Sequence, residues 1–341
     1  MKIIAVVPTI REECMKEFLR LWLPQMETKR IELIIVEDDP QKSFNIEHPL
    51  VSHYCWEDID RELGEDSWII PRRTDCVRSF GYWLAWKQGA DIVITLDDDC
   101  YPENANFFDE HIRLLSEPIS LWESTMPFRV RGMPYIEDGK RETVMNHGVW
   151  SKIPDLDGVS HLANLNLRSS PAVESHIMRT WFPMCGMNLA FKREIIPLMY
   201  FLLMGKDWPY DRWGDIWCGL FAQKIIRHLG LGIRSGMPSV IHDKASNVFA
   251  NIRKEASGYE INESFWRAID SVSLTARSPI QCYWEILENL SMGMFFKIDF
   301  KNGYWKKLIE AQRIWLNLFK RRITNEDNAD NADNTAKSVA D

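Results

Sequence analysis

The sequence predicts an α/β fold in which a mostly parallel β-sheet is flanked by helices. Three short apolar runs rich in β-branched residues, 3–7, 31–36 and 92–96, are typical of buried strands. Each run ends in polar residues, and segments with helical spacing lie between the runs. The chain has 341 residues, 45% of them hydrophobic, so it can bury a large core. In such folds the ligand lies at the carboxyl ends of the strands.

The first unit reads strand, helix, strand, which predicts a parallel βαβ arrangement. The helix is expected over 12–25, because its apolar residues recur at helical spacing. Arg11, at the end of the first strand, is placed to meet a phosphate, or it is a surface arginine in the first turn of the helix. Asp38 ends the second strand, where it could bond a base or ribose or serve only the turn before Pro40.

A second anion site is predicted where a loop meets a helix. The segment 41–66 is polar and mixed, a strand is expected over 67–70, and a helix is expected over 77–88. Three arginines, Arg72, Arg73 and Arg78, lie between them, and helix N-termini attract negative charge. The alternative is that Arg72 and Arg73 are solvated and that Arg78 pairs with a carboxylate.

Three consecutive aspartates, Asp97, Asp98 and Asp99, follow the strand at 92–96. Adjacent carboxylates repel one another, and a divalent cation would relieve that repulsion. Mg²⁺ prefers one or two carboxylates together with substrate phosphate oxygens. In extended backbone side chains alternate, so Asp97 and Asp99 should share one face while Asp98 points away. This run predicts a metal site for a diphosphate; the alternative is a solvated acidic turn or a helix N-cap.

The second half of the chain predicts a different set of elements. A helix is expected over 104–116, and two extended segments, 121–130 and 143–150, flank a charged turn at 137–141. These two segments would form a small antiparallel lid region. Gly186 and Asn188 lie in an apolar stretch, where a glycine allows close backbone approach to a ligand or marks a β-bulge. Helices are also expected over 194–204, 216–229 and 264–290.

Aromatic and charged residues gather between 207 and 215, which suits a sugar site. Asp215 stands near the start of a helix, so it is an N-cap, a sugar-site carboxylate, or both. His242 and Lys244 follow a strand-like segment, where the first could complete a metal site and the second could hold a phosphate; a lone histidine is more often structural. The expected boundaries are a domain over 1–300, an amphipathic helix over 301–323 and a disordered tail over 324–341. The helix is expected to dock within the protein, with another subunit or a membrane surface as the alternatives.

Composition excludes several classes of protein. The net charge is −8 and no long basic run is present, which argues against nucleic-acid binding. The seven cysteines are scattered without a C-x-x-C pair, which fits reduced thiols better than disulfides or a zinc site. No apolar stretch is long enough to span a bilayer. Together these features predict a cytoplasmic protein.

Nine short motifs in order carry a resemblance to a known family. They are Pro8-Thr-Ile-Arg11, Leu33-Ile-Ile-Val-Glu-Asp38, Asp58-Ile-Asp-Arg-Glu-Leu-Gly64, Arg78-Ser-Phe-Gly81, Thr95-Leu-Asp-Asp-Asp-Cys100, Val130-Arg-Gly132, His147-Gly-Val-Trp150, Phe182-Pro-Met-Cys-Gly-Met-Asn-Leu-Ala-Phe191 and His242-Asp-Lys-Ala-Ser-Asn247. Between residues 3 and 254 the chain resembles the reversibly glycosylated polypeptide family, whose members include plant UDP-arabinopyranose mutases.

The resemblance implies a glycosyltransferase-A-like fold that binds a UDP-sugar with Mn²⁺ or Mg²⁺. It implies interconversion of the pyranose and furanose forms of the sugar without a flavin, for cell-wall or surface polysaccharide synthesis. The expected catalytic residues are Asp97, Asp98 and Asp215, and the expected metal ligands are Asp97, Asp99 and His242. The expected nucleotide-sugar-binding residues are Thr9, Arg11, Asp38, Arg78, His147, Trp150, Asn188, Arg212 and Lys244.

One departure from the family pattern matters for the reaction. Plant members carry a self-glycosylated arginine at a position that falls on Asp138 here, and Arg141 lies nearby but out of register. Two alternatives to a mutase therefore stay open. The first is a glycosyltransferase that moves the sugar to a separate acceptor, and the second is a non-catalytic partner that binds sugar nucleotides. Assembly into homo- or hetero-oligomers is left open as well.

Overall fold

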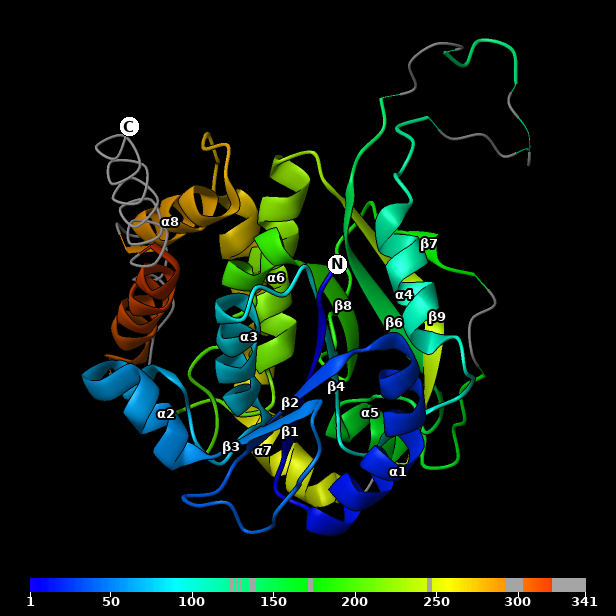
Figure 1. Cartoon of the computed structure of the whole chain (residues 1–341). Coiled ribbons are helices and arrows are strands. Elements are labelled where there is room, and N and C mark those ends of the chain that lie inside the picture. Colours follow the sequence, from blue (N-terminus) through cyan, green and yellow to red (C-terminus); the bar gives the residue numbers. More distant parts are fainter. Residues whose placement is uncertain are drawn as a thin grey trace, which may run out of the picture.

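A computed structural model describes residues 1–122, 126, 128, 130–134, 139–170, 174–243, 247–291 and 303–320. Its first half contains a parallel sheet in the spatial order β3-β2-β1-β4, formed by β1 (Ile3–Thr9), β2 (Glu32–Glu37), β3 (Val51–Tyr54) and β4 (Ile92–Leu96). Helix α1 (Glu12–Lys29) connects β1 to β2, as the sequence predicts. Along the chain, helices α2 (Trp56–Leu63) and α3 (Arg78–Lys87) follow β3 and precede β4; both are labelled in Figure 1.

Beyond β4 the sheet is mixed. The order continues as β8-β6-β9-β5, with β8 (Asn188–Lys192) antiparallel to both β4 and β6 (Thr143–Lys152). Strand β6 runs parallel to β9 (Gly232–His242), while β5 (Cys100–Pro102) and the short β7 (His176–Ile177) pair antiparallel with β9. The α/β fold class is therefore confirmed, with helices on both faces of the sheet.

Several local predictions are wrong. The segment 143–150 is not part of a lid: it forms most of β6, which pairs on both sides within the main sheet and is largely buried. Its lid partner, 121–130, has no strand among the residues that the structure describes there. The strand expected at 67–70 is a 3₁₀ helix over Gly64–Ile69, and β3 arises in the segment read as irregular. The helix expected over 194–204 is limited to a 3₁₀ turn, Arg193–Leu198.

The two faces of the sheet carry separate cores, because side chains alternate along a strand. On β1, Ala5 and Val7 pack with α1 and with α4 (Phe107–Ser116) on one face. Ile4 and Val6 pack on the other face with α3 and α6 (Gly214–His228). The remaining helices are α5 (Gly158–Ala163), α7 (Val248–Ser271) and α8 (Pro279–Asn289), so the predicted helix 264–290 is interrupted (Figure 1).

A final helix over residues 304–320 docks on the α3 and α6 side of the molecule. Three buried polar contacts fix it: Trp315 Nε1 donates to Pro197 O at 2.8 Å, Tyr304 Oη to Leu203 O at 2.8 Å, and Gln312 Nε2 to Tyr283 Oη at 2.9 Å. Its apolar face is thereby part of the core, as the amphipathic pattern indicates. The predicted tail lies outside the described residues.

Two observations bear on the predictions from composition. All seven cysteines are free thiols, and six of them are buried. Within the described ranges, none of the helices has the length and hydropathy needed to cross a membrane.

Candidate functional site

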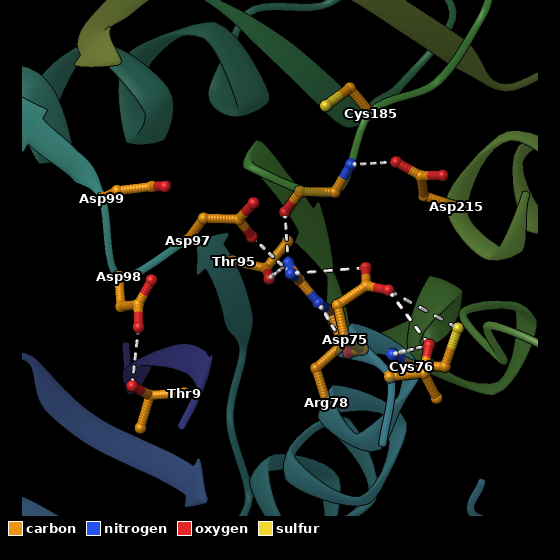
Figure 2. A network of polar contacts seen from close by, with 12 residues as sticks. Thr9, Asp75, Cys76, Arg78, Thr95, Asp97, Asp98, Asp99, Cys185 and Asp215 are labelled. Carbon is orange, nitrogen blue, oxygen red and sulfur yellow. Dashed lines mark hydrogen bonds and ion pairs between the residues drawn. The ribbon is translucent and has the colours of Figure 1, made fainter. Parts of the chain in front are cut away.

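The three aspartates after β4 do not continue the strand. The backbone turns at Asp98 and Asp99, and Cys100 N donates to Asp97 O at 3.1 Å. The extended geometry assumed for them is therefore wrong. Each side chain has its own surroundings (Figure 2). Asp98 is buried and accepts a hydrogen bond from Thr9 Oγ1 at 2.6 Å, which ties the end of β4 to the end of β1.

Arg11 neutralises the last two of the three carboxylates, Asp98 and Asp99. Its Nη2 pairs with Asp98 Oδ1 and lies 3.1 Å from Asp99 Oδ2. Burial lowers the pKa of Arg11, but the hydrogen bond and charge of Asp98 outweigh burial and raise it above its ordinary value. The Arg11 side chain is 35% exposed, so its guanidinium can still reach a ligand. Thr9, Arg11, Asp98 and Asp99 thus form one cluster, as predicted for the end of the parallel strands.

Asp97 is held from the other side by Arg78, at the N-terminus of α3. The Arg78 side chain is 1% exposed, and its Nη2 pairs with Asp97 Oδ1. Its Nη1 donates to Thr95 Oγ1 at 3.0 Å and to Gly186 O at 2.6 Å. Because protein groups surround this guanidinium, Arg78 orients Asp97. The alternative weighed for Arg78, that it pairs with a carboxylate, is the arrangement that the structure shows.

A cavity of about 230 Å³ lies beside Asp97. It is lined by the start of α6, the loop before β8, the loop before α5 and the side of α7. Seven carboxylates face it against three cations, Arg78, Arg212 and Lys254. The carboxylates are Asp75, Asp97, Asp155, Asp157, Asp211, Asp215 and Glu255. An acidic cavity of this size suits a ligand with many hydroxyl donors or with developing positive charge.

Asp215 is the carboxylate in this cavity with the most altered acidity. Burial, together with the nearby charges of Asp75 and Asp155, raises its pKa to about 7. Two backbone hydrogen bonds oppose the shift: Gly186 N donates to Oδ2 at 3.1 Å and Ile216 N to Oδ1 at 2.8 Å. The N-cap of α6 is Trp213, so Asp215 is not the N-cap, although its carboxylate accepts a bond from Ile216 N within the first turn. Asp215 lines the cavity, and its role in a sugar site stays a prediction. A carboxyl with a pKa near 7 can take up and return a proton at neutral pH.

Arg212 forms part of the cavity wall. It has a positive φ of 64° and its Nε donates to Glu255 Oε1 at 2.8 Å. Glu255 Oε2 also accepts from Gly158 N at 2.6 Å and Tyr259 Oη at 2.9 Å, which joins α5 to α7. Arg212 therefore lies at the predicted sugar site, where it is already paired with a carboxylate.

His147 and Asn188 are buried behind the residues that line the cavity, and their predicted contact with the nucleotide sugar stays a prediction. His147 Nε2 accepts from Cys185 N at 3.1 Å, so this ring holds the loop that lines the cavity. Asn188 Nδ2 donates to Val149 O at 2.8 Å and Pro238 O at 3.0 Å. Both residues are buried, and their bonds fasten β6, β8 and β9 together. They position the site without lining it.

The remaining predicted residues are placed as follows. Asp38 accepts from Trp56 Nε1 at 2.8 Å and Arg73 N at 2.9 Å, so it joins the loop after β2 to α2 and to the loop before α3. Within the turn itself it is Asp39 that accepts, from Gln41 N, and contact of Asp38 with a base or ribose stays a prediction. Trp150 is half-buried against the α1-side core. His242 is buried and lies opposite Cys100 where β5 pairs with β9. Lys244 and Asp138 lie outside the described residues.

The donor atoms at the end of β4 fit a divalent cation that shares its ligands with a substrate. Asp97 and Asp99 offer hard oxygen atoms, and His242 Nδ1 contacts Ile153 O at 2.8 Å, which leaves Nε2 as the nitrogen available to a metal. Among the described residues, no three side chains of His, Cys, Asp or Glu converge into a complete site. Mg²⁺ is commonly held by one or two carboxylates plus phosphate oxygens, so a site completed by a diphosphate agrees with this arrangement.

Sequence reasoning missed several residues of the cavity, among them Asp75, Asp155, Cys185 and Glu255. Asp75 precedes Arg78 by one helical turn, a spacing that could have indicated it. Cys185 Sγ lies 3.1 Å from Asp155 Oδ2, across 30 residues of chain. Asp155 and Glu255 come from segments without a local motif, so only the tertiary fold brings them to Asp97.

The buried histidine gives a testable pH effect. Burial lowers the pKa of His147 to about 4, so the unfolded chain binds its proton first as the pH falls. Below pH 6.5, His147 therefore lowers the free energy of unfolding by about 1.4 kcal/mol for each pH unit, down to its pKa in the folded protein. We expect His147→Gln to remove this component. Urea unfolding of both proteins between pH 7 and 5 measures it, and parallel curves for the two proteins would contradict the assignment.

A family model described as reversibly glycosylated polypeptide matches residues 2–324 of the chain. UDP-arabinopyranose mutase 1 of Arabidopsis thaliana is 36% identical over 333 residues, which cover 91% of this chain and 90% of the relative. UDP-arabinopyranose mutase 3 of the same plant is 38% identical, with 92% and 90% covered. UDP-arabinopyranose mutase 1 of Oryza sativa subsp. japonica is 34% identical, with 91% and 88% covered.

Solved structures show a more distant likeness. Staphylococcal TarS (S. aureus, residues 1–349) has a TM-score of 0.42 at 13% identity, covering 93% of this chain and 79% of that one. A glucosyl-3-phosphoglycerate synthase from Mycobacterium tuberculosis, in complex with Mn²⁺, UDP and glucosyl-3-phosphoglycerate, has a TM-score of 0.39 at 12% identity, with 79% and 77% covered.

Proposed function

The chain belongs to the reversibly glycosylated polypeptide family, and we propose on this basis that it is a UDP-sugar pyranose mutase, acting on a sugar such as arabinose. The observation that carries the proposal is the position of Asp215. This carboxyl has a pKa of about 7 and lines the same acidic cavity as Asp97, at the end of β4. A mutase needs such a group, because isomerisation moves a proton between two oxygens of one sugar.

The sugar occupies the acidic cavity, with its hydroxyls donating to the carboxylates. The diphosphate lies at the edge, near Arg11, because the excess of negative charge inside would repel it. When the bond from C1 to the diphosphate breaks, positive charge develops on C1 and the ring oxygen. Carboxylates fixed around the cavity, Asp97 and Asp215 among them, stabilise that charge without having to reorganise.

Asp215 then moves one proton. The 4-hydroxyl attacks C1, and Asp215 takes its proton as the new C1–O4 bond forms. Asp215 returns the proton to O5 as the C1–O5 bond breaks, which turns the six-membered ring into a five-membered one. The diphosphate oxygen bonds to C1 again and the UDP-furanose is complete. Nothing is oxidised or reduced, and Asp215 ends in its starting state.

A divalent cation held by Asp97 and Asp99, with His242 at the edge of the site, would neutralise the diphosphate as it leaves. Arg78 keeps Asp97 in place for that role, and Thr9 and Arg11 keep Asp98 and Asp99 at the end of the strand. We place the reaction in the cytoplasm, where its furanose product would supply polysaccharide synthesis.

Incubation of the purified protein with UDP-arabinopyranose and Mg²⁺ or Mn²⁺ tests the proposal. We expect a UDP-arabinofuranose peak on anion-exchange chromatography, and a rate at least tenfold lower when EDTA removes the metal, because two carboxylates then face the diphosphate unscreened. The control is UDP-arabinopyranose with heat-denatured protein. If no UDP-pentose or UDP-hexose gives a furanose peak, or if sugar moves only to an added acceptor, the mutase assignment is overturned.

A further inference from the structure

The cations that face the cavity at Asp97 are already occupied. Seven carboxylates and three cations line it, and each cation is paired with a carboxylate of the same lining. The pairs are Arg78 with Asp97 and Asp75, Arg212 with Glu255, and Lys254 with Asp211. In the part of the lining that the structure describes, the carboxylates outside these pairs are Asp155, Asp157 and Asp215. A ligand group that enters the cavity therefore meets uncompensated negative charge.

The three carboxylates outside the pairs are held by neutral donors. The Cys185 thiol donates to Asp155 Oδ2 at 3.1 Å, and burial raises the pKa of this thiol, so it is uncharged at neutral pH. Asp157 Oδ1 accepts from two backbone N–H groups at the start of α5, both at 3.0 Å. Asp215 likewise accepts from two backbone N–H groups. Such donors fix the direction of a carboxylate without cancelling its charge.

The acidity of Asp215 reports the same negative charge. Burial contributes most to its pKa of about 7, and the charges of Asp75 and Asp155 raise it further. Charges that oppose ionisation of a carboxyl group in the wall also oppose entry of a carboxylate on a ligand. A sugar hydroxyl meets no such opposition, because it donates a hydrogen bond to a carboxylate oxygen.

We propose that this cavity selects nucleotide sugars by charge: it accepts sugars that carry only hydroxyls and rejects uronic acids, with Asp155 as a specificity-determining residue. The inference rests on the proposed function, because it takes the sugar to occupy this cavity. Asp155 is singled out because it lies outside the ion pairs of the lining and, unlike Asp97 and Asp215, has no part in the proposed metal binding or proton transfer. Repulsion of a near-identical ligand is a common source of specificity.

Three UDP-sugars separate the effect of charge from that of size. UDP-arabinopyranose, UDP-galactose and UDP-galacturonic acid share the configuration of their ring hydroxyls. They differ at C5, which carries only hydrogen in the first, a hydroxymethyl group in the second and a carboxylate in the third. The step from the first sugar to the second measures the cost of size. The step from the second to the third measures charge, since a hydroxymethyl group and a carboxylate are similar in size.

Isothermal titration near pH 7, at one Mg²⁺ concentration throughout, gives the dissociation constant of each UDP-sugar and of UDP. We expect UDP-galacturonic acid to bind at least about tenfold more weakly than UDP-galactose. In Asp155→Asn this ratio should shrink by about threefold, because one of the repelling charges is gone. Asp157→Asn should shrink the ratio in the same direction, and it covers the case that Asp155→Asn does not fold, since asparagine also caps helices.

Asp91→Asn is the matched control. It changes the net charge of the protein by the same amount, but Asp91 precedes β4 at the end of the strand away from the cavity, where it accepts from Lys2 N at 2.6 Å. The ratio of the two dissociation constants should stay as it is in the unsubstituted protein. An equal narrowing in Asp91→Asn and Asp155→Asn would overturn the role of Asp155.

The titrations also distinguish this inference from the proposed function. If UDP binds but UDP-galacturonic acid binds as tightly as UDP-galactose, or neither binds, selection by charge is wrong and the proposed function is unaffected. If UDP itself does not bind, both are overturned. No turnover is measured, so a protein that binds these sugars without isomerising them would still show the expected ratio.

Discussion

Replacing Asp215 by asparagine should reduce kcat/KM for isomerisation by about 100- to 10,000-fold, the range in which a general acid–base group contributes. The substitution keeps the shape of the side chain and one acceptor for the N–H of Gly186 or Ile216. It removes the only cavity carboxyl whose pKa is shifted to about 7 among the described residues. Substrate binding should change much less, since the diphosphate lies at the other edge of the site.

The pH dependence of stability checks the same residue independently. The pKa of Asp215 is about 7 in the folded protein against 3.8 ordinarily, so the folded state holds its proton where the unfolded chain has lost it. The contribution of Asp215 is therefore fully present below pH 3.8 and is lost as the pH rises through 7. Relative to Asp215→Asn, the free energy of unfolding of the unsubstituted protein should fall by about 1.4 kcal/mol per pH unit over part of the range between pH 3.8 and 7.

Asp91→Asn is the control for this substitution. Asp91 precedes β4 at its other end and is exposed; its carboxylate lies 3.8 Å from the chain N-terminus and accepts from Lys2 N at 2.6 Å. Its replacement should leave both the rate and the pH profile of stability unchanged. A normal isomerisation rate in Asp215→Asn, measured on protein with an intact unfolding transition, would show that another group moves the proton.

The parallel half of the sheet could be predicted because its signals are local. The strands β1, β2 and β4 are apolar runs buried on both faces, and such runs are recognisable without knowledge of their neighbours. Strand β6 could not be placed in this way. Its burial comes from pairing with β8 and β9, at 40 or more residues of separation, so nothing near residues 143–152 distinguishes a central strand from a lid.

The residues of the site divide in the same way, into those with a local sequence signal and those that only the tertiary fold brings together. Residues at the ends of predicted strands, Thr9, Arg11 and the three aspartates, do meet, because parallel strands present their carboxyl ends at one edge. His147 and Asn188 were assigned to the ligand from a family motif, and a motif marks a position without saying which way its side chain points. Their burial makes them supports of the site. Glu255 was missed because its partners, Arg212 and Gly158, lie 43 and 97 residues away.

Arg78 shows how much of the site rests on one buried cation. We expect Arg78→Met to lower the free energy of unfolding by about 3 kcal/mol, the lower end of the range for breaking a buried ion pair. The lower end applies because Asp97 keeps 30% of its side chain exposed and water can reach it. The loss also includes the bonds to Thr95 Oγ1 and Gly186 O, whose acceptors would be left in the interior.

The pH dependence of the stability loss in Arg78→Met shows whether the Arg78–Asp97 ion pair is its source. Burial raises the pKa of Asp97, but the charge and hydrogen bond of Arg78 lower it below its ordinary value. The ion pair therefore contributes stability above pH 3.8, and this contribution disappears as the pH falls through the folded pKa. The difference between the unsubstituted protein and Arg78→Met, measured by urea unfolding, should be largest near pH 7 and should narrow below pH 4.

Arg61→Met provides the comparison, since Arg61 pairs with Asp58 three residues before it, as Arg78 does with Asp75. The Arg61 side chain is 65% exposed and its ion pair is screened by solvent, so its loss should cost much less stability than the loss of Arg78. Equal costs for the two substitutions would mean that Arg78 is an ordinary helix arginine. A large cost for Arg78→Met together with full isomerisation activity would mean that the position of Asp97 does not matter for turnover, and the proposed metal-binding role of Asp97 would then be wrong.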